Sequence, residues 1–442
     1  MSGASPTPTP PHTVDPVAPI APTPGLRGLS AYKVPQHPAP IDLVLSGNEG
    51  PCPPIDLTGE LLRVGPEVLR RYPDARALTA KLAARFGVTA DRLLVTAGAD
   101  DALDRAFRAF LSAGDTVVLP SPTFVMLPHY ARLIGATMVT PTWAAEDFPV
   151  EAVEAALDAG PPRAIALVSP NNPTGAAIPT GTLLSLAKRS PSTLVMVDFA
   201  YVEMADEDPT MALLELPNVL VFRTLSKAWG LAGLRVGYVL GDPRLIAILR
   251  AAGPPYAVTA ASLALAERHL DQNEGAMRGY VELVRKEREA LFDALARCGT
   301  RPVRSAGNFV FARCRSEAQA VWLRDGLASL GIGVRAFPGD PWVGDGVRIT
   351  CPGNREQTER LIHAIEATLA PQDRLMRVDE LDGLARPAWF LARDVVEIAY
   401  ARSKGAVPIA VGDPKDAFSQ TLLAAGAARV APSFEALEAS IV

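Results

Sequence analysis

Short runs of apolar residues alternate with longer amphipathic stretches between about residue 26 and residue 369. The amphipathic stretches, such as Asp100–Leu111 and Thr180–Lys188, have the spacing of helices. Nearly continuous apolar strands separated by helices indicate a mainly parallel sheet covered on both faces, so the predicted class is α/β. The predicted strands are Leu93–Val95, Val117–Leu119, Ile165–Val168, Leu194–Val197, Val219–Phe222 and Val236–Leu240.

Two changes of pattern divide the chain further. A long charged helix is predicted from Asp271 to Leu295, and the strand–helix region after it ends near Leu369. We interpret this part as a second, smaller α+β lobe. Residues 371–442 differ in pattern again and are predicted to form a separate small α/β unit.

The composition points to an unusual N-terminal end. Of the 41 prolines, 14 fall within the first 54 residues and eight precede Gly25. Residues 1–24 are therefore predicted to be a disordered tail, with a polyproline ligand as the alternative. The tail has neither the basic start of a signal peptide nor the arginines of a transit peptide, and no apolar run is long enough to span a membrane.

Charge and thiol content narrow the class of protein. The 442 residues are 48% hydrophobic, enough for a large core, and ~150 residues per domain suggests two or three domains. A net charge of −5 gives no support for a nucleic-acid partner. The four cysteines are scattered and the five histidines form no ligand-spaced cluster, so we expect reduced thiols, a cytoplasmic protein and no metal site.

The segments that follow the predicted strands carry the candidate chemistry, because ligands of open α/β sheets bind beyond the carboxyl ends of the strands. Gly98, Ala99 and Asp100 form a small-residue turn that opens a helix, which suits a phosphate group but also makes an ordinary helix cap. Phe124 places an aromatic ring at the same edge, although the local evidence alone favours a core phenylalanine.

Polar residues follow three further strands. The turn Ser169–Gly175 holds Asn172, and the segment after the next strand holds Asp198 and Tyr201. A lysine is usually a solvated surface charge. Lys227, however, follows a buried strand among small and apolar neighbours, where desolvation would lower its pKa. Together with the hydroxyls and the guanidinium of Thr224, Ser226 and Arg235, these groups match the needs of pyridoxal phosphate (PLP), which are a Schiff-base lysine and an acidic partner for the pyridine nitrogen.

At this point the chain resembles the fold-type-I PLP-dependent aminotransferases of class I/II, and most closely the histidinol-phosphate aminotransferases. The resemblance covers about residues 25–370 and implies a large domain at about 56–270 and a small domain made of about 25–55 plus 271–370. The motifs that carry it are Arg27–Tyr32, Gly47–Pro51, Arg71–Asp74, Gly98–Asp101, Ser169–Gly175, Arg223–Arg235, Gly307–Phe309 and Val347–Thr350.

The resemblance implies a role for each cofactor residue. Lys227 would bind PLP as a Schiff base and later move the substrate proton, while Asp198 would keep the pyridine nitrogen protonated. Asn172 and Tyr201 would hydrogen-bond the ring oxygen, and Phe124 would stack on the ring. The phosphate would be held by Gly98, Ala99, Asp100, Thr224, Ser226, Arg235 and, from a second subunit, Tyr72, so that a homodimer is implied.

On the substrate side, the resemblance implies that Arg348 binds the carboxylate of glutamate or 2-oxoglutarate, and that Arg335 with Tyr32 holds a substrate phosphate. Asn172 would also touch the substrate. Three positions depart from the family pattern. Phe199 replaces a glutamate, Leu127 stands where many relatives have a tyrosine, and Gly50 replaces an asparagine.

The implied reaction converts L-histidinol phosphate and 2-oxoglutarate into imidazole acetol phosphate and glutamate, a step of histidine biosynthesis. The alternatives are an aromatic amino acid aminotransferase and a lyase similar to threonine-phosphate decarboxylase. A PLP-containing transcription regulator is disfavoured because the residues before Arg27 are too few and too rich in proline for a DNA-binding domain. A pseudoenzyme is disfavoured because every cofactor position is chemically competent.

The C-terminal unit has its own pattern. It is predicted to contain a strand at Ala388–Leu391, a helix at Val395–Lys404, a strand at Val407–Val411, a helix ending near Ala425 and a last helix from Ser433. The Gly-Asp turn with Asp413 and Asp416 resembles the end of a haloacid-dehalogenase-type phosphatase, although an ordinary turn and helix cap would look the same. Since 72 residues are too few for such a hydrolase, we predict a non-catalytic remnant, with an unrelated appendage as the alternative.

Overall fold

A computed structural model describes residues 22–29, 31, 37–143, 146–369, 389–433 and 436. Most of the predicted tail (1–24) and Tyr32 therefore lie outside the described residues. Within the described part of the chain, no helix is long and apolar enough to cross a membrane.

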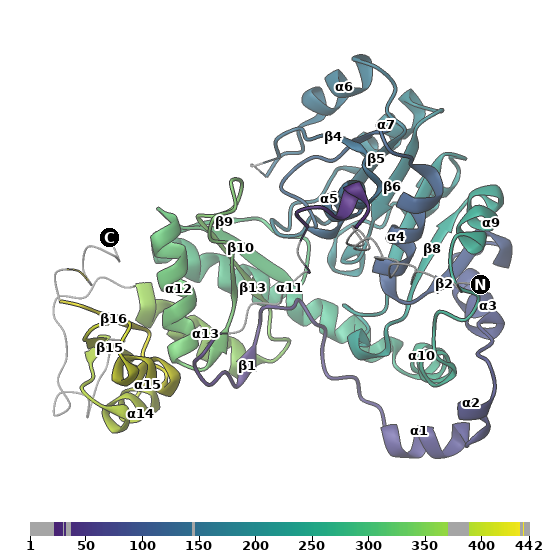
Figure 1. The fold of residues 1–442 in the computed structure, drawn as a ribbon. Coiled ribbons are helices and arrows are strands. Elements are labelled where there is room, and N and C mark those ends of the chain that lie inside the picture. The colour runs from purple at the N-terminus through teal and green to yellow at the C-terminus, as the bar shows by residue number, and fades with distance from the viewer. Residues whose placement is uncertain are drawn as a thin grey trace, which may run out of the picture.

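A seven-stranded sheet forms the centre of the larger part of the molecule (Figure 1). Only β8 runs antiparallel to its neighbours, so the mainly parallel sheet predicted from the sequence is confirmed. All six predicted strands are present within one or two residues, and the edge strand β4 is an addition. In sheet order, the strands are β2 (Leu93–Thr96), β8 (Gly237–Gly241), β7 (Val219–Thr224), β6 (Leu194–Asp198), β5 (Ala164–Val168), β3 (Thr116–Val118) and β4 (Thr137–Val139).

Helices cover both faces of this sheet, because successive side chains of a buried strand point to opposite sides and both sides are apolar. One face packs against α4 (Gly98–Phe110), α5 (Met126–Ile134) and α9 (Pro243–Ala251). The other face packs against α3 (Arg76–Arg85), α6 (Val150–Asp158), α7 (Thr180–Arg189), α8 (Thr210–Leu214) and α10 (Ala260–Gln272). The short helices α1 (Leu57–Val64) and α2 (Glu67–Arg70) lead into α3, and single 3-10 turns occur at Pro24–Leu26, Ala90–Arg92, Val202–Met204 and Ala232–Leu234.

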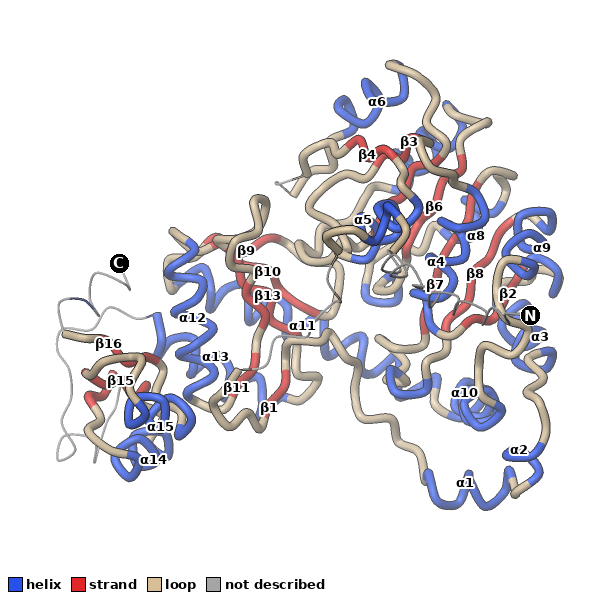
Figure 2. Tube along the Cα trace, viewed as in Figure 1, coloured by secondary structure: helices blue, strands red, loops and turns tan. Residues whose placement is uncertain are grey.

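The long helix α11 (Glu274–Arg297) leads from the large sheet to a smaller lobe (Figure 2). It begins three residues later than predicted, because α10 ends at Gln272. The lobe contains an antiparallel sheet in the order β12 (Arg335–Ala336), β13 (Gly346–Thr350), β10 (Phe309–Arg313), β9 (Arg301–Val303), together with α12 (Glu317–Ser329) and α13 (Arg355–Leu369). The N-terminal strand β1 (Leu43–Val44) pairs with β11 (Ile332–Gly333), so that the segment before α1 lies with this lobe.

The C-terminal unit is a three-stranded parallel sheet in the order β14 (Trp389–Leu391), β15 (Val407–Val411), β16 (Arg429–Ala431), with helices α14 (Val395–Ser403) and α15 (Ala417–Ala425). Strand β16 was not predicted, while Ala388 and most of the helix expected from Ser433 lie outside the described residues. Figure 1 shows the unit beside α12 and α13, on the side of the small lobe away from the large sheet.

Candidate active site

A cavity of about 830 Å³ lies between the carboxyl edge of the large sheet and the strands β12 and β13 of the small lobe. Residues that the sequence placed on seven separate segments meet in its wall. The predicted site residues that line it are Ala99, Asp100, Phe124, Asn172, Asp198, Tyr201, Thr224, Ser226, Lys227, Arg235, Arg335 and Arg348.

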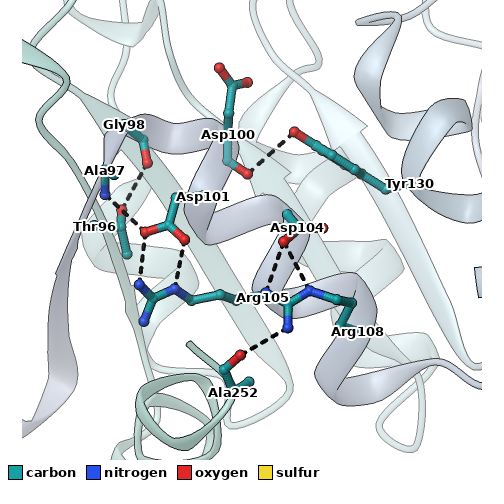
Figure 3. Close-up of polar contacts among 10 residues, drawn as sticks. All are labelled: Thr96, Ala97, Gly98, Asp100, Asp101, Asp104, Arg105, Arg108, Tyr130 and Ala252. Atoms are coloured by element: carbon teal, nitrogen blue, oxygen red, sulfur yellow. Dashed lines mark hydrogen bonds and ion pairs between the residues drawn. The ribbon is translucent and has the colours of Figure 1, made fainter. Parts of the chain in front are cut away.

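The first turn of α4 forms one end of the cavity. Asp101 accepts a hydrogen bond from the Ala97 amide at 2.9 Å and binds Arg105 through two bonds, so its carboxylate points away from the cavity (Figure 3). Asp100 projects to the opposite side. The amides of a first helical turn have no partner within the helix, so Ala99 and Asp100 present a favourable site for an anion.

Two glycines keep this end of the cavity open. A Cβ atom at Gly98, where φ is +82°, would lie 2.6 Å from Nη2 of Arg235. A Cβ atom at Gly237 would lie 2.5 Å from the amide nitrogen of Ala99. A side chain at Gly98 would therefore displace the guanidinium, and one at Gly237 would push the start of α4 away from β8.

The phosphate side of the predicted site also contains two linked hydroxyls and an ion pair. The Thr224 hydroxyl donates to that of Ser226 at 2.9 Å. Nη2 of Arg235 lies 3.5 Å from a carboxylate oxygen of Asp100, and both side chains are about half exposed. Burial raises the pKa of Asp100, while Arg235 and Lys227 oppose that rise.

Asp198 is the last residue of β6 and is 4% exposed. One carboxylate oxygen accepts a hydrogen bond from the Ala200 amide at 3.0 Å, and among the described residues the carboxylate makes no ion pair. Burial raises the pKa of Asp198 to about 7. The site therefore holds a buried carboxyl group without a direct ion pair among the described residues, and the charge of Lys227 offsets only part of the effect of burial on its pKa.

Lys227 lies just beyond β7 and is half-buried. Its Nζ donates to the carbonyl oxygen of Gly47 at 3.3 Å and lies 5.6 Å from the centre of the Tyr201 ring. The neighbours Ala228 and Trp229 are buried as expected, but the lysine side chain itself is directed into the cavity rather than enclosed in the core. Lys227 is therefore partly shielded from solvent in the single chain.

Two arginines of the small lobe also line the cavity. Arg348 donates hydrogen bonds to Oδ1 of Asn172 and to the carbonyl oxygen of Ser46. Because a guanidinium can only donate, the amide nitrogen of Asn172 is left to face the cavity. Arg335 is the direct cross-strand partner of Arg348, and its guanidinium lies 5.5 Å from the centre of the Phe337 ring.

The three departures from the family pattern have distinct surroundings. Leu127 and Phe199 are buried in the core and do not line the cavity. At Gly50, a Cβ atom would collide with the carbonyl oxygen of Lys227, so a side chain there requires a different path of the backbone.

Asn48 belongs to the Gly47–Pro51 motif but was not predicted as a site residue. It is buried, and its side-chain amide donates to the hydroxyl of Tyr201 at 3.1 Å. Its partners come from segments that are distant in sequence, so no local pattern indicates this contact. The one available signal was its place in the Gly47–Pro51 motif.

Tyr72 lies apart from the cavity of its own chain. Its side chain is 79% exposed and stacks on Tyr256, with ring centres 4.5 Å apart. In the C-terminal unit, Asp413 accepts from the Lys415 amide at 3.0 Å and Asp416 from the Ser419 amide at 2.6 Å. These bonds are those of a turn and a helix cap.

Comparison with known proteins identifies the family. Residues 60–365 match the model of the family described as aminotransferase class I and II. A histidinol-phosphate aminotransferase of Mesorhizobium japonicum is 34% identical over 339 residues, which cover 74% of this chain and 89% of the relative. An aromatic amino acid aminotransferase of Corynebacterium efficiens is also 34% identical, over 74% of this chain and 93% of the relative.

Among solved structures, histidinol-phosphate aminotransferase from Sinorhizobium meliloti in complex with pyridoxal-5'-phosphate matches with a TM-score of 0.70 and 25% identity, over 78% of this chain and 97% of that one. The C-terminal unit lies beyond the region matched by the family model. The fold, the cavity and these matches together show that the chain is a PLP-dependent enzyme and belongs to the class I and II aminotransferases.

Proposed function

We propose that this enzyme transfers the amino group of L-histidinol phosphate to 2-oxoglutarate, giving imidazole acetol phosphate and glutamate in histidine biosynthesis. The observation that carries the proposal is the direct cross-strand pairing of Arg335 with Arg348 in the wall of the cavity. Like charges directly opposite each other on a sheet are destabilising. Two guanidinium groups in this arrangement favour anionic ligands, and one substrate carries a phosphate while the other carries carboxylates.

The residues of the cavity fit PLP. The first turn of α4, the linked hydroxyls of Thr224 and Ser226, and Arg235 would hold the phosphate. Asp198 is a buried carboxyl group that makes no ion pair among the described residues, and a protonated pyridine nitrogen would supply a partner. Phe124 would cover one face of the ring.

When bound, PLP withdraws electrons from the substrate carbon whose proton is removed. The chain supplies the groups that bind and move protons around it. Lys227 would hold the cofactor and then carry the proton. Asp198 would keep a proton at the pyridine nitrogen, while Asn172 and Tyr201 would donate hydrogen bonds to the ring oxygen. Arg348 would orient the substrate carboxylate.

We further propose a homodimer in which Tyr72 reaches the phosphate of the second active site. Its exposure and its distance from the cavity of its own chain support this role. Tyr72→Phe, which keeps the ring stacked on Tyr256, should raise the Kd for PLP in equilibrium dialysis. A strictly monomeric enzyme in analytical ultracentrifugation would contradict the assignment.

We also propose two domains within the aminotransferase part. The large domain spans about 56–270, and the small domain combines about 25–55 with 271–370. They agree with the division into the large sheet and the lobe that contains β1. We also propose that residues 371–442 are a non-catalytic remnant of a haloacid-dehalogenase-type hydrolase. The use of Asp413 and Asp416 in a turn and a cap supports a structural role for this unit.

A half-reaction assay tests the choice of substrate. The PLP form of the enzyme is mixed with L-histidinol phosphate, phenylalanine or O-phosphothreonine, and the cofactor absorbance is followed. We expect the highest kcat/KM with L-histidinol phosphate. An aromatic donor is the second candidate, because the relative from Corynebacterium efficiens is as similar as the first. Release of carbon dioxide from phosphothreonine without an oxo acid would instead identify a lyase.

The role of Lys227 is tested separately. Lys227→Ala should abolish both the absorbance of the lysine-bound cofactor and turnover. Lys188→Ala, at an exposed lysine of α7, is the matched control and should leave both unchanged. Persistent turnover of Lys227→Ala would refute the assigned role.

A further inference from the structure

Asn48 has an unusual backbone conformation next to the cavity. It follows β1, is 1% exposed and has φ of +53°. Among the described residues, only Asn48 and Arg235 combine a side chain with a clearly positive φ. Asparagine tolerates this region better than most residues, and such conformations persist where the surrounding structure holds them.

The hydrogen bonds around Asn48 fix the orientation of its amide. The backbone amide of Asn48 donates to the Thr350 hydroxyl at 3.1 Å, and this hydroxyl donates to Oδ1 of Asn48 at 3.0 Å. Since a hydroxyl has a single proton, this pair of bonds uses Thr350 as acceptor and donor at once. The NH2 group of Asn48 is then directed to the hydroxyl oxygen of Tyr201, 3.1 Å away.

This orientation decides what Tyr201 can do. Its oxygen accepts the bond from Asn48, so its own proton is not used in that contact. We propose that Asn48 is a positioning residue that turns the Tyr201 proton into the cavity, toward the ring oxygen of PLP. The inference rests on the proposed role of Tyr201 and adds a residue to which no role had been assigned.

The same contact links the cofactor side of the cavity to the substrate side. Thr350 and Arg348 are two residues apart on β13 and therefore lie on the same face of the strand. Arg348 orients Asn172, and Thr350 orients Asn48 and through it Tyr201. Two residues of β13 thus orient the two side chains, Asn172 and Tyr201, that are proposed to donate to the ring oxygen of PLP.

The test is a pH titration of the visible absorbance of the holoenzyme without substrate. A donor at the ring oxygen stabilises its negative charge, so the bound chromophore loses its proton at lower pH. Asn48→Gly keeps the left-handed backbone and removes the amide. It should raise the titration midpoint by about one pH unit, the size expected for one hydrogen bond to a charged group.

Asn48→Asp is the second variant. A carboxylate has the same shape but can only accept, so it would draw the Tyr201 proton away from the cavity. We expect it to raise the midpoint at least as far as Asn48→Gly. An unchanged midpoint in both variants would overturn the proposal.

A double-mutant cycle with Tyr201→Phe separates this role from a merely structural one. In the Tyr201→Phe background, Asn48→Gly should cause no further shift, whereas an equal shift in both backgrounds would overturn the proposal. Asn218→Ala is the matched control, because Asn218 also makes three hydrogen bonds but lies outside the cavity. It should lower the unfolding temperature without moving the midpoint.

The cycle also distinguishes two failures. If Tyr201→Phe itself leaves the midpoint unchanged, the proposed role of Tyr201 is wrong and the inference fails with it. If Tyr201→Phe shifts the midpoint and the Asn48 variants do not, only the role of Asn48 is wrong. Neither result depends on which amino donor the enzyme uses.

Discussion

Asp198 is the residue at which the sequence and the structure agree most closely. An acidic residue at the end of a buried strand was expected to be costly without a cationic partner. The structure shows that cost, since the carboxyl is almost fully buried and its pKa is raised to about 7. On the proposed assignment, a bound pyridinium would offset this cost by giving the carboxylate a cationic partner.

The raised pKa gives a prediction for the cofactor-free enzyme. A carboxyl group that titrates near 7 when folded and near 4 when unfolded stabilises the fold least at high pH. Its contribution is fully present below about pH 4 and is lost as the pH rises toward 7. The amide in Asp198→Asn does not titrate, so this variant does not lose stability as the pH rises. At pH 8 its free energy of unfolding should exceed that of the wild type by up to about 4 kcal/mol.

Urea unfolding of both cofactor-free proteins between pH 4 and pH 8 measures this difference. The two proteins should be equally stable near pH 4 and should diverge as the pH rises. With PLP bound, the advantage of Asp198→Asn should disappear, because the wild type then has its cationic partner. A difference independent of pH would contradict the assignment to Asp198.

Some residues of the site could be assigned from the sequence, whereas others could not. Lys227, Asp198 and Arg235 stand next to predicted strands, so that topology alone brings them to one edge of the sheet. Asn48 depends instead on Thr350, 302 residues away in sequence. Hydrogen bonds of that kind form only when folding brings distant segments of the chain together, and no local pattern encodes them.

At the scale of elements, the central strands were predictable because they are buried on both faces and read as continuous apolar runs. Strand β4 was missed because it lies at the sheet edge with two exposed residues. Strands β1 and β11 have two residues each, too few for any periodicity, and exist because they pair with each other. The sequence therefore predicted that the small lobe is α+β, but it did not predict the order and direction of its strands.

The pairing of β12 with β13 yields the second prediction. If Arg335 holds the substrate phosphate, Arg335→Ala should lower kcat/KM for L-histidinol phosphate about 100-fold, as expected for a lost charge-assisted bond. The value for phenylalanine should change only a few-fold. Arg348→Ala should impair both donors, because Arg348 also orients Asn172, which is proposed to donate to the ring oxygen of PLP whichever donor is bound.

Steady-state kinetics with both donors would measure this selectivity. Arg304→Ala is the matched control, since Arg304 also lies over a phenylalanine ring, at 5.0 Å from the centre of Phe292, but outside the cavity. It should leave both donors unaffected. An equal loss for the two donors in Arg335→Ala would show that Arg335 does not read the phosphate.

At the scale of the whole molecule, the C-terminal unit is joined to the small lobe by a buried apolar cluster. Trp322, Ala367, Val407, Ile409, Ala428 and Ala431 form that cluster. Trp322 and Trp389 meet edge to face with ring centres 5.1 Å apart, and both indoles donate to the carbonyl oxygen of Thr368, at 3.0 and 3.3 Å. The unit is therefore packed on α12 and α13 and is not a free appendage.

This packing predicts that the unit and the small lobe share stability. Trp389→Ala removes one ring of the pair and should lower the free energy of unfolding by about 3 kcal/mol, the lower end of the range for a tryptophan in a core. Hydrogen exchange should then increase in α12 and β15, with the large sheet unaffected.

Phe418→Ala, at a phenylalanine of α15 that is 58% exposed, is the control and should change neither quantity. The groups assigned to catalysis lie on other elements, so kcat should stay within a few-fold of the wild type. Unchanged exchange in α12 and β15 would show that the cluster does not hold the two parts together.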